Sequence, residues 1–338
     1  MKSKFIVFVD EQIRMMCSQG KIGTSNTYLA VSRSVMAFSG KCSLPLRAVF
    51  TKDFLHRYQA YLLDRECCYN TISSYMRVLR AIRNKAEKLG LISVEADLFN
   101  KLYTGSEPTR KRALRGDVIL DLNGVDLSDC PHLVMSRELF MLLFHLQGMS
   151  FVDLAHLRKS DLKGDYIIYR RRKTGGLISV RIWAPARELL DRYLSTDKHS
   201  PYLLSILDGD TQYRSVLHRF NRHLKSLAKL LDIREPLTSY VARHSWATAA
   251  YHAGTPVALI SEAMGHKTEE VTRIYLDSFD TETMDNVNRI AWESLLRNRT
   301  TGKKAGKRNS KDPWRRIRDV SFLGRERHSL KNGWTRGG

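Results

Sequence analysis

The sequence has few cysteines, and their arrangement argues against two classes of protein. The 338 residues contain five of them, an odd number that cannot all pair. They also lack the paired spacing of zinc ligands. A disulfide scaffold and a zinc-binding module are therefore both disfavoured, no bound metal is expected, and a reducing cytoplasm is the predicted compartment. The five are Cys17, Cys42, Cys67, Cys68 and Cys130.

Long hydrophobic runs are also missing. The longest, residues 139–144, is far shorter than the ~20 apolar residues that cross a bilayer. Phe5–Val9 is too short for the core of a signal peptide and leads directly into Asp10 and Glu11. The sequence thus predicts a soluble, intracellular protein with no membrane partner. It contains no Walker loop, dinucleotide fingerprint or internal repeat, so we expect no cofactor.

Acidic residues are outnumbered, since 35 Asp and Glu stand against 56 Lys and Arg and the formal net charge is +21. Such a surplus favours a polyanionic partner, and nucleic acid is preferred over a membrane because no strongly apolar stretch accompanies the charge. Residues 297–338 are especially rich in Lys, Arg and Gly and are predicted to be a mostly disordered, DNA-attracting tail. The length allows two domains, each with its own core.

Residues 1–102 are predicted to form a small helical domain. Apolar residues recur at helical spacing over residues 24–38 and again after Thr51, a good helix cap. The clearest helix is predicted to start at Asn70, as its N-cap, and to stop at Gly90. Three arginines lie off its apolar stripe, either as a solvated basic face or, in so basic a chain, as phosphate contacts. They are Arg77, Arg80 and Arg83.

Residues 103–117 are predicted to be an interdomain linker. Gly105, Pro108 and Gly116 argue against regular structure there. Its cations suit a segment that runs along a phosphate backbone. Three of these cations are candidate DNA-binding residues: Arg110, Lys111 and Arg112.

The second predicted domain, residues 118–296, combines helices with one β-hairpin. Apolar runs at helical spacing predict its helices, and alternating apolar residues around a Thr-Gly-Gly turn predict two strands. The fold class is therefore mainly α with a small β-hairpin or sheet. The predicted helices cover residues 137–147, 185–194, 213–231 and 281–296, and the strands cover 166–172 and 177–182.

The most informative stretch is residues 238–276. Arg243 lies on a predicted helix, and Tyr275 follows nine positions after His266. A guanidinium matches two phosphate oxygens and keeps its charge, and an imidazole donates to an oxygen or moves a proton near neutral pH. A phenol, with a free pKa of about 10, attacks phosphorus only when activated. Singly, the three residues would be a surface cation, a helix-end histidine and a core aromatic; together they indicate attack on a phosphodiester.

This stretch resembles the catalytic region of the tyrosine recombinases, the phage-integrase family of site-specific recombinases. The resemblance extends more weakly over most of residues 1–296. It implies a helical N-terminal domain that clamps DNA, a mixed α+β catalytic domain and a catalytic lysine on the β-hairpin, which Lys173 matches. The matching segments are Ala242–Thr248, Met264–Lys267 and Val271–Tyr275.

The resemblance also implies a reaction and its partners. Tyr275 would join the 3′ phosphate and expel a 5′ hydroxyl, while Arg243 neutralises phosphoryl oxygens, Lys173 protonates the leaving oxygen and His266 donates to a non-bridging oxygen. Neither a metal nor a nucleotide is needed. The expected partners are double-stranded DNA with paired recombination sites, a homotetramer on that DNA and accessory DNA-bending proteins. The expected location is the bacterial cytoplasm, in association with the nucleoid.

Two positions depart from the family pattern. Tyr240 stands where the family usually has a histidine, and it could hydrogen-bond the phosphate as a weaker base. The family's first arginine usually completes a Gly-Leu/Met-Arg motif, and here that residue is Ser150. A subgroup from mobile elements of anaerobic gut bacteria shares the Met-Ser-Phe-Val-Asp sequence. That subgroup has an arginine just before the glycine, where this chain has Gln147. Arg158 and Arg137 are the nearest cations in sequence that could replace the missing arginine. Gln147→Arg is expected to accelerate cleavage, and Ser150→Arg to do the same if the backbone there follows the wider family.

Three functions therefore compete. The preferred one is a recombinase that integrates, excises or inverts a mobile element. The second is a DNA-binding protein that kept the clamp and lost the chemistry, which the Ser150 and Gln147 positions motivate. The third is a type IB topoisomerase. It is disfavoured because the helix predicted at 281–296, which in the family docks on the neighbouring subunit, has no use in a monomeric enzyme.

Overall fold

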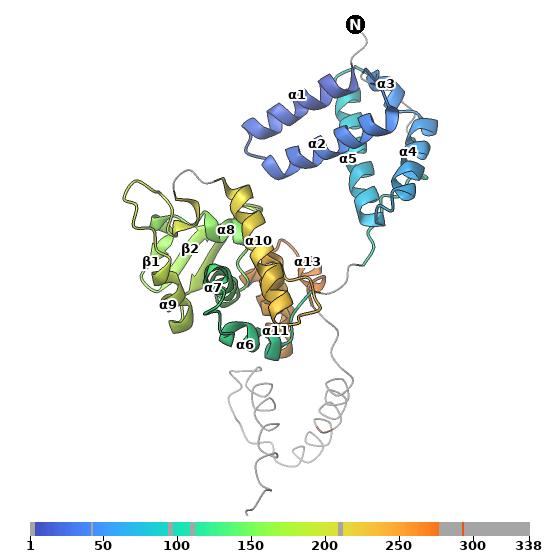
Figure 1. The fold of residues 1–338 in the computed structure, drawn as a ribbon. Coiled ribbons are helices and arrows are strands. Elements are labelled where there is room, and N and C mark those ends of the chain that lie inside the picture. The colour runs from blue at the N-terminus through green and yellow to red at the C-terminus, as the bar shows by residue number, and fades with distance from the viewer. Residues whose placement is uncertain are drawn as a thin grey trace, which may run out of the picture. The chain divides into compact units, whose positions relative to one another are not determined.

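The computed structural model describes residues 4–276, apart from 42, 94–96, 109–111 and 209–211, together with Glu293. The chain divides into two compact units, Met1–Thr109 and Arg110–Gly338, and the division falls inside the predicted linker. The described part is mainly helical with one small antiparallel sheet, which confirms the predicted fold class (Figure 1). The predicted helix at 281–296, apart from Glu293, lies outside the described residues, as do the basic tail, Arg110 and Lys111.

The first unit is a cluster of helices around an apolar core. Helices α1 and α2 lie side by side (Figure 1), and the largest fully buried side chains include Phe5, Tyr58 and Met76. Thr51 caps α4 as predicted, because its hydroxyl accepts from the Phe54 amide at 3.2 Å. The helices are α1 (Phe5–Ser18), α2 (Ile22–Ser39), α3 (Leu46–Val49), α4 (Lys52–Asp64) and α5 (Tyr69–Lys88).

The predicted start of α5 is wrong by two residues, since its N-cap is Cys68 and Asn70 lies inside the helix. The Asn70 amide is used elsewhere: its Nδ2 donates to the Glu107 carbonyl at 3.0 Å, and its Oδ1 accepts from the Glu107 amide at 2.9 Å. Ser73 adds a bond to the Gly105 carbonyl at 2.6 Å. The first part of the predicted linker is therefore fixed along α5.

The second unit contains eight described helices and a three-stranded sheet. Gly116, predicted to interrupt regular structure, instead begins a helix, and a short extra strand precedes the predicted hairpin. Two 3₁₀ turns, Lys159–Asp161 and Ser205–Leu207, connect the elements. The helices are α6 (Gly116–Gly124), α7 (Pro131–His145), α8 (Phe151–Ala155), α9 (Ala184–Arg192), α10 (Tyr213–Leu230), α11 (Ser239–His252), α12 (Val257–Ala263) and α13 (Glu269–Arg273). The strands are β1 (Leu162–Lys163), β2 (Tyr166–Arg170) and β3 (Leu177–Arg181).

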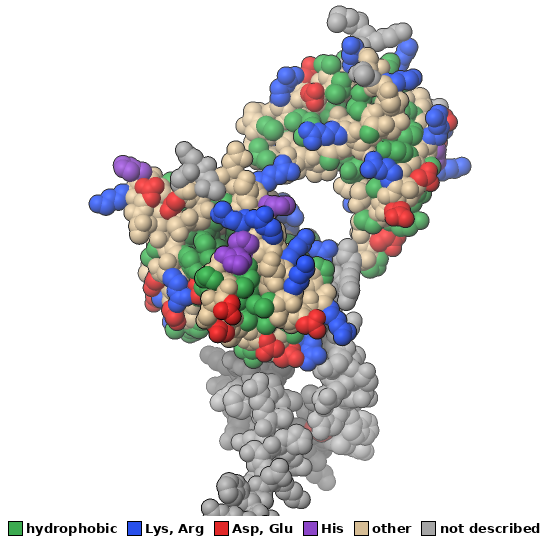
Figure 2. All heavy atoms as spheres, viewed as in Figure 1, with side chains coloured by type: hydrophobic (Ala, Val, Ile, Leu, Met, Phe, Trp, Pro, Cys, Tyr) green, Lys and Arg blue, Asp and Glu red, His purple; other side chains and the backbone are tan. Residues whose placement is uncertain are grey.

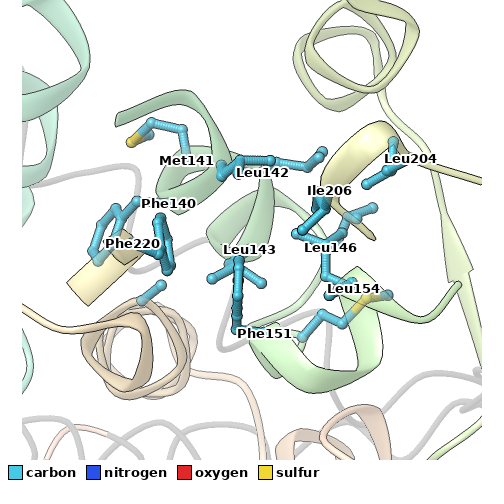
Figure 3. Packing of buried hydrophobic residues seen from close by; sticks show 14 of the residues in the cluster. Phe140, Met141, Leu142, Leu143, Leu146, Phe151, Leu154, Leu204, Ile206 and Phe220 are labelled. Atoms are coloured by element: carbon cyan, nitrogen blue, oxygen red, sulfur yellow. The ribbon is translucent and has the colours of Figure 1, made fainter. Parts of the chain in front are cut away.

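Helix α7 is the centre of the second core, and it starts six residues before the predicted position because Pro131 suits the first helical turn. Its Phe140, Leu142 and Leu143 are fully or almost fully buried. The rings of Phe151 and Phe220 stack with centroids 4.4 Å apart, which joins α8 to α10 (Figure 3). This core fixes the segments that carry the candidate site.

The sheet turns one face inward. Strands β2 and β3 pair in antiparallel register, with Ile167 opposite Val180 and Tyr169 opposite Ile178, and all four are buried. The inward face of the hairpin packs towards the loop after α12, where Gly265 contacts Ile178 closely. None of the described helices is long and apolar enough to span a bilayer.

Candidate active site

Arg243 lies at the centre of the candidate site, on the buried side of α11. Only 2% of its surface is exposed. Its Nη1 donates to the Gly148 carbonyl at 2.6 Å, and its Nη2 donates to the Met264 carbonyl at 2.5 Å. Burial, and then the positive charge of Arg171, lower the pKa of Arg243. The guanidinium is thus fixed between the loops that follow α7 and α12.

Gly148 allows this close packing. Its φ is +65°, which favours glycine, and a Cβ there would lie 3.1 Å from the Arg243 Cα. A larger residue would push the α7–α8 loop away from α11. The backbone of the loop at residues 148–150 therefore packs directly against the backbone of α11 at Arg243.

His266 supports Arg243 from the other side. Its Nε2 lies 3.0 Å from the Arg243 Nη2, and its Nδ1 lies 2.8 Å from the Thr272 hydroxyl. Because a guanidinium can only donate, the Nε2 must accept, and the neutral ring carries its proton on Nδ1. Burial, with the charges of Arg243, Arg171 and Lys173, lowers the pKa of His266 to about 3. In this arrangement the ring orients Arg243 and offers no Nε2 proton to a phosphate, unlike the expected role.

Tyr275 is folded into the same site. It is 6% exposed, its ring stacks on His244 with centroids 4.4 Å apart, and its carbonyl accepts from the Thr248 hydroxyl at 3.3 Å. The ring of His266 lies 5.1 Å away. The predicted nucleophile therefore meets Arg243 and His266 of its own chain.

Tyr240 contacts the nucleophile directly, since the two phenolic hydroxyls are hydrogen-bonded. Burial, and then this bond, raise the pKa of Tyr240. It therefore stays protonated near neutral pH and cannot act as an ionised base. Its hydroxyl is available to Tyr275 as a hydrogen-bond partner.

Lys173 lies in the exposed turn between β2 and β3, as predicted. Its charge is near enough to lower the pKa of His266, after burial and the two arginines. The next residue, Thr174, donates to the Gly265 carbonyl at 3.5 Å. The hairpin turn thus borders the site, with Lys173 exposed to solvent.

The phage integrase family matches residues 112–282, and the phage integrase SAM-like domain matches residues 4–101. This chain belongs to the phage integrase family. The predicted family of tyrosine-type site-specific recombinases is therefore confirmed, while the likeness to the gut-bacterial subgroup stays a prediction.

Relatives of this recombinase include two named tyrosine recombinases. XerC of Rickettsia canadensis is 24% identical over 232 residues, which cover 64% of this chain and 73% of the relative. XerS of Streptococcus thermophilus is 27% identical over 215 residues, which cover 60% and 58%. Their similarity extends over more than half of the chain.

Solved integrase structures share the fold. A lambda integrase dimer bound to a COC′ core site has a TM-score of 0.63 at 16% identity, covering 82% of this chain and 99% of that one. The Tn1549 transposon integrase in complex with a circular intermediate DNA has a TM-score of 0.58 at 14% identity, covering 85% and 100%. A lambda integrase tetramer bound to a Holliday junction has a TM-score of 0.63 at 17% identity, covering 83% and 80%.

The recombinase site contains a second guanidinium that the sequence reasoning missed. Arg171 is 6% exposed, its Nη1 donates to the Gly265 carbonyl at 2.7 Å, and its charge acts on both Arg243 and His266. One signal could have identified it. The inward alternation of Ile167 and Tyr169 continues to position 171, and a buried arginine there is unusual unless it has a specific role.

Neither arginine proposed from sequence proximity fills the vacant position. The Arg137 guanidinium donates to the Val125 carbonyl at 3.0 Å and pairs with Glu138 at 3.2 Å. Arg158 is exposed, and its backbone amide donates to Asp161. Both suggestions were wrong because nearness in sequence does not bring these side chains to Arg243, whereas the β-hairpin brings Arg171 there.

The predicted DNA-binding arginines of α5 have partners within the protein. Arg77 donates through Nε and Nη2 to the Thr104 carbonyl, at 3.1 and 2.7 Å. Arg80 lies over the Phe99 ring at 5.2 Å, and Arg83 pairs with Glu87 at 3.2 Å. Their contact with DNA stays a prediction, as does that of the exposed Arg112.

Helix α10 is a further basic surface that sequence reasoning missed. It contains no acidic residue, and its Lys and Arg side chains are exposed. Figure 2 shows Lys, Arg and His side chains gathered over this helix. Its exposed cations are Arg214, Arg219, Arg222, Lys225 and Lys229. No cluster of three His, Cys, Asp or Glu side chains that could hold a metal occurs in the described part of the chain.

Proposed function

We propose that this recombinase cleaves and rejoins DNA at Tyr275 through a 3′-phosphotyrosine. The observation that supports this assignment is the pair of buried guanidiniums beside a buried phenol. Arg243 and Arg171 are 2% and 6% exposed, and the Tyr275 hydroxyl lies among the side chains that surround them. Two neighbouring buried cations repel each other and are costly to desolvate, so an anion between or beside them relieves the cost.

The proposed step transfers the phosphoryl group of the scissile phosphate from the 5′ oxygen to the Tyr275 Oη. The Tyr275 Oη attacks phosphorus, its proton passes through the Tyr240 hydroxyl to solvent, and the bond from phosphorus to the 5′ oxygen breaks. The Lys173 ammonium supplies the proton that this oxygen takes up. Tyr240 suits the relay because its hydroxyl bonds Tyr275 while 42% of its surface is exposed. The reverse step, with a new 5′ hydroxyl, rejoins the strand.

The two guanidiniums stabilise the charge on the non-bridging oxygens as it develops. A fixed donor aimed at such a charge contributes on the order of 10² to 10³ in rate. His266, whose Nε2 accepts from Arg243 at 3.0 Å, keeps that arginine in place. In this assignment Arg171 takes the part of the family's first arginine, so cleavage is favoured over the interpretation as a pure DNA-binding protein.

The DNA contacts are proposed for α10 and for the first unit. The exposed cations of α10 suit phosphate contacts along a duplex. The lambda integrase dimer on a core site and tetramer on a Holliday junction support a homotetramer on paired sites. The Tn1549 transposon integrase supports a role in integration, excision or inversion of a mobile element. Accessory DNA-bending proteins and association with the nucleoid remain part of the proposal.

The test is covalent capture of DNA. The protein is incubated with sheared DNA that flanks its own coding sequence, denatured with detergent, and the linked DNA ends are sequenced. We expect one recurrent end, joined through a 3′ phosphate, with wild type and none with Tyr275→Phe, which should still bind DNA. Binding without any linked DNA would favour the DNA-binding protein. Capture of single sites, with relaxation of a plasmid that bears one site, would favour the topoisomerase.

A further inference from the structure

We infer that Ser150 and Asp153 are positioning residues that direct Arg171 toward the scissile phosphate. Position 150 lacks the family's first arginine, and its serine would instead belong to a relay, a chain of contacts that holds Arg171. The inference rests on the proposed function, because it concerns how Arg171 meets the phosphate. It extends that function by assigning a role to the residue at which this chain departs from its family.

The relay begins at the start of α8. Ser150 is the N-cap of this helix, and its Oγ donates to the Asp153 Oδ2 at 2.6 Å. The Asp153 amide lies 3.4 Å from the same Oγ, which is a weak capping contact. Capping of the helix alone would need only the contact between the Asp153 amide and the Ser150 Oγ. The short bond to the carboxylate therefore orients Asp153 as well as ending the helix.

Asp153 connects α8 to the hairpin. It is 3% exposed, its Oδ1 accepts from the Arg172 amide at 2.9 Å, and its Oδ2 lies 3.9 Å from the Arg171 Nε. One carboxylate thus holds both the backbone and the charge of consecutive hairpin residues. A buried carboxylate with these partners is costly to leave unpaired, so its geometry is strongly determined.

Arg171 is held without using all of its donors. Its backbone amide donates to the Gly176 carbonyl at 2.8 Å, and its Nη1 donates to the Gly265 carbonyl at 2.7 Å. At 3.9 Å the Asp153 carboxylate attracts the charge without forming a hydrogen bond. Neither its Nε nor its Nη2 makes a hydrogen bond to the described residues. Because the Nε faces the Asp153 carboxylate at 3.9 Å, the Nη2 is the nitrogen that we assign to a phosphate oxygen.

The relay predicts that Ser150→Arg lowers the cleavage rate, whereas the family pattern predicts that it raises the rate. An arginine at position 150 would lie three residues from Asp153 and would pair with its carboxylate. Two guanidiniums would then compete for one partner, and Arg171 would lose its orientation. Ser150→Arg should therefore slow cleavage, although it recreates the Gly-Met-Arg motif of the family.

The experiment measures the rate of covalent-complex formation on the duplex recovered by capture, nicked to trap the intermediate. Asp153→Asn should lower the rate by about 10- to 100-fold, the usual effect of losing a hydrogen bond to a charged group. Ser150→Ala should lower it by about tenfold, Ser150→Thr should restore most of that loss, and Ser150→Arg should be no faster than Ser150→Ala. Asp165→Asn, which removes an exposed carboxylate near the same hairpin, is the matched control. A Ser150→Arg rate at or above wild type would overturn the inference.

A second substrate separates positioning from general damage. A methylphosphonate at the scissile position carries no charge on the reacting group and so needs less neutralisation. The ratio of wild-type to Asp153→Asn rates should shrink toward one on this substrate, and an unchanged ratio would contradict the inference. Circular dichroism and duplex binding check that each variant folds.

A third measurement needs no cleavage. The Nε–Hε resonance of Arg171, assigned by its loss in Arg171→Lys, should exchange slowly with water in wild type and faster in Asp153→Asn. If wild type never links to DNA, the proposed function fails, but this resonance still reports the positioning. Equal exchange in the two proteins would overturn the inference by itself.

Discussion

The hydroxyl of Tyr240 is hydrogen-bonded to the hydroxyl of Tyr275, 35 residues away in sequence. Tyr240→Phe removes this partner and leaves the ring contacts with His244 and Tyr275 in place. We expect the cleavage rate to fall about 3- to 10-fold, since a neutral hydrogen bond contributes roughly 0.5–1.5 kcal/mol. The covalent-complex assay measures this change, with duplex affinity as the control. Loss of cleavage as complete as in Tyr275→Phe would mean that Tyr240, too, takes an essential part in the chemistry.

Arg171 is expected to contribute directly to the rate. Arg171→Gln should slow covalent-complex formation by about 10² to 10³, because a fixed donor to the transition-state oxygens is lost. Its neighbour Arg170 has the same charge but is exposed and donates to the Gly175 carbonyl. Arg170→Gln is therefore the matched control. Similar rates for Arg171→Gln and wild type would exclude Arg171 from the chemistry.

His266 should make stability depend on pH. Its pKa is about 3 in the folded protein and about 6.5 in an unfolded chain. Between these values only the unfolded chain binds a proton there, so the free energy of unfolding contributed by His266 is present above pH ~6.5 and is lost as the pH falls toward 3. The stability advantage of wild type over His266→Gln should shrink between pH 7 and pH 4.5 in urea titrations. An advantage that does not change with pH would contradict the low pKa.

Gly265 should tolerate no side chain. Its φ is +62°, and a Cβ there would lie 2.6 Å from the Ile178 Cδ1 and 3.2 Å from the Arg171 Cδ. Gly164 provides a control, because its φ is +59° with nothing within 4 Å. Gly164→Ala should cost about 1–2 kcal/mol from its backbone alone, and Gly265→Ala should cost more and also slow cleavage. Thermal and urea unfolding measure both, and equal costs would show that the hairpin contact is unimportant.

Helix α10 should determine part of the salt dependence of duplex binding. Arg222→Gln removes an exposed cation and should reduce the slope of log K against log salt by about 0.9 if it contacts one phosphate. Arg187→Gln removes the same charge from a residue paired with Asp165 and Asp191, and it should leave the slope unchanged. Equal slopes in Arg222→Gln and wild type would place the duplex elsewhere.

The sequence was sufficient to predict which residues form the centre of the site. The spacing of Arg243, His266 and Tyr275 predicted that they meet, and the structure brings them together through Arg243–His266 and His266–Tyr275 contacts. Arg171 was missed because a charged residue at the end of a predicted strand usually belongs to a solvated turn. Its burial depends on Asp153 and Gly265, which are distant in sequence.

Predictions of helix starts from single residues were wrong where a contact with a distant part of the chain uses the same residue. Asn70 is a good helix cap by composition, yet its amide holds both backbone groups of Glu107 and Cys68 takes the cap position. Similarly, Gly116 begins α6 although glycine disfavours helices. Strand β1 has two residues and no periodicity of its own, so only its pairing with β2 identifies it.

The attachment of Glu107 to Asn70 also sets the reach between the two units. Leu114 is fixed in the second unit, where its amide donates to the Ser245 hydroxyl at 2.8 Å. From Glu107 to Leu114 the chain can extend at most about 25 Å. If both units bind one duplex, as proposed, a tether this short gives the second unit an effective concentration in the millimolar range once the first has bound. The avidity for that duplex would then depend on the length of this short segment, which takes no part in the chemistry.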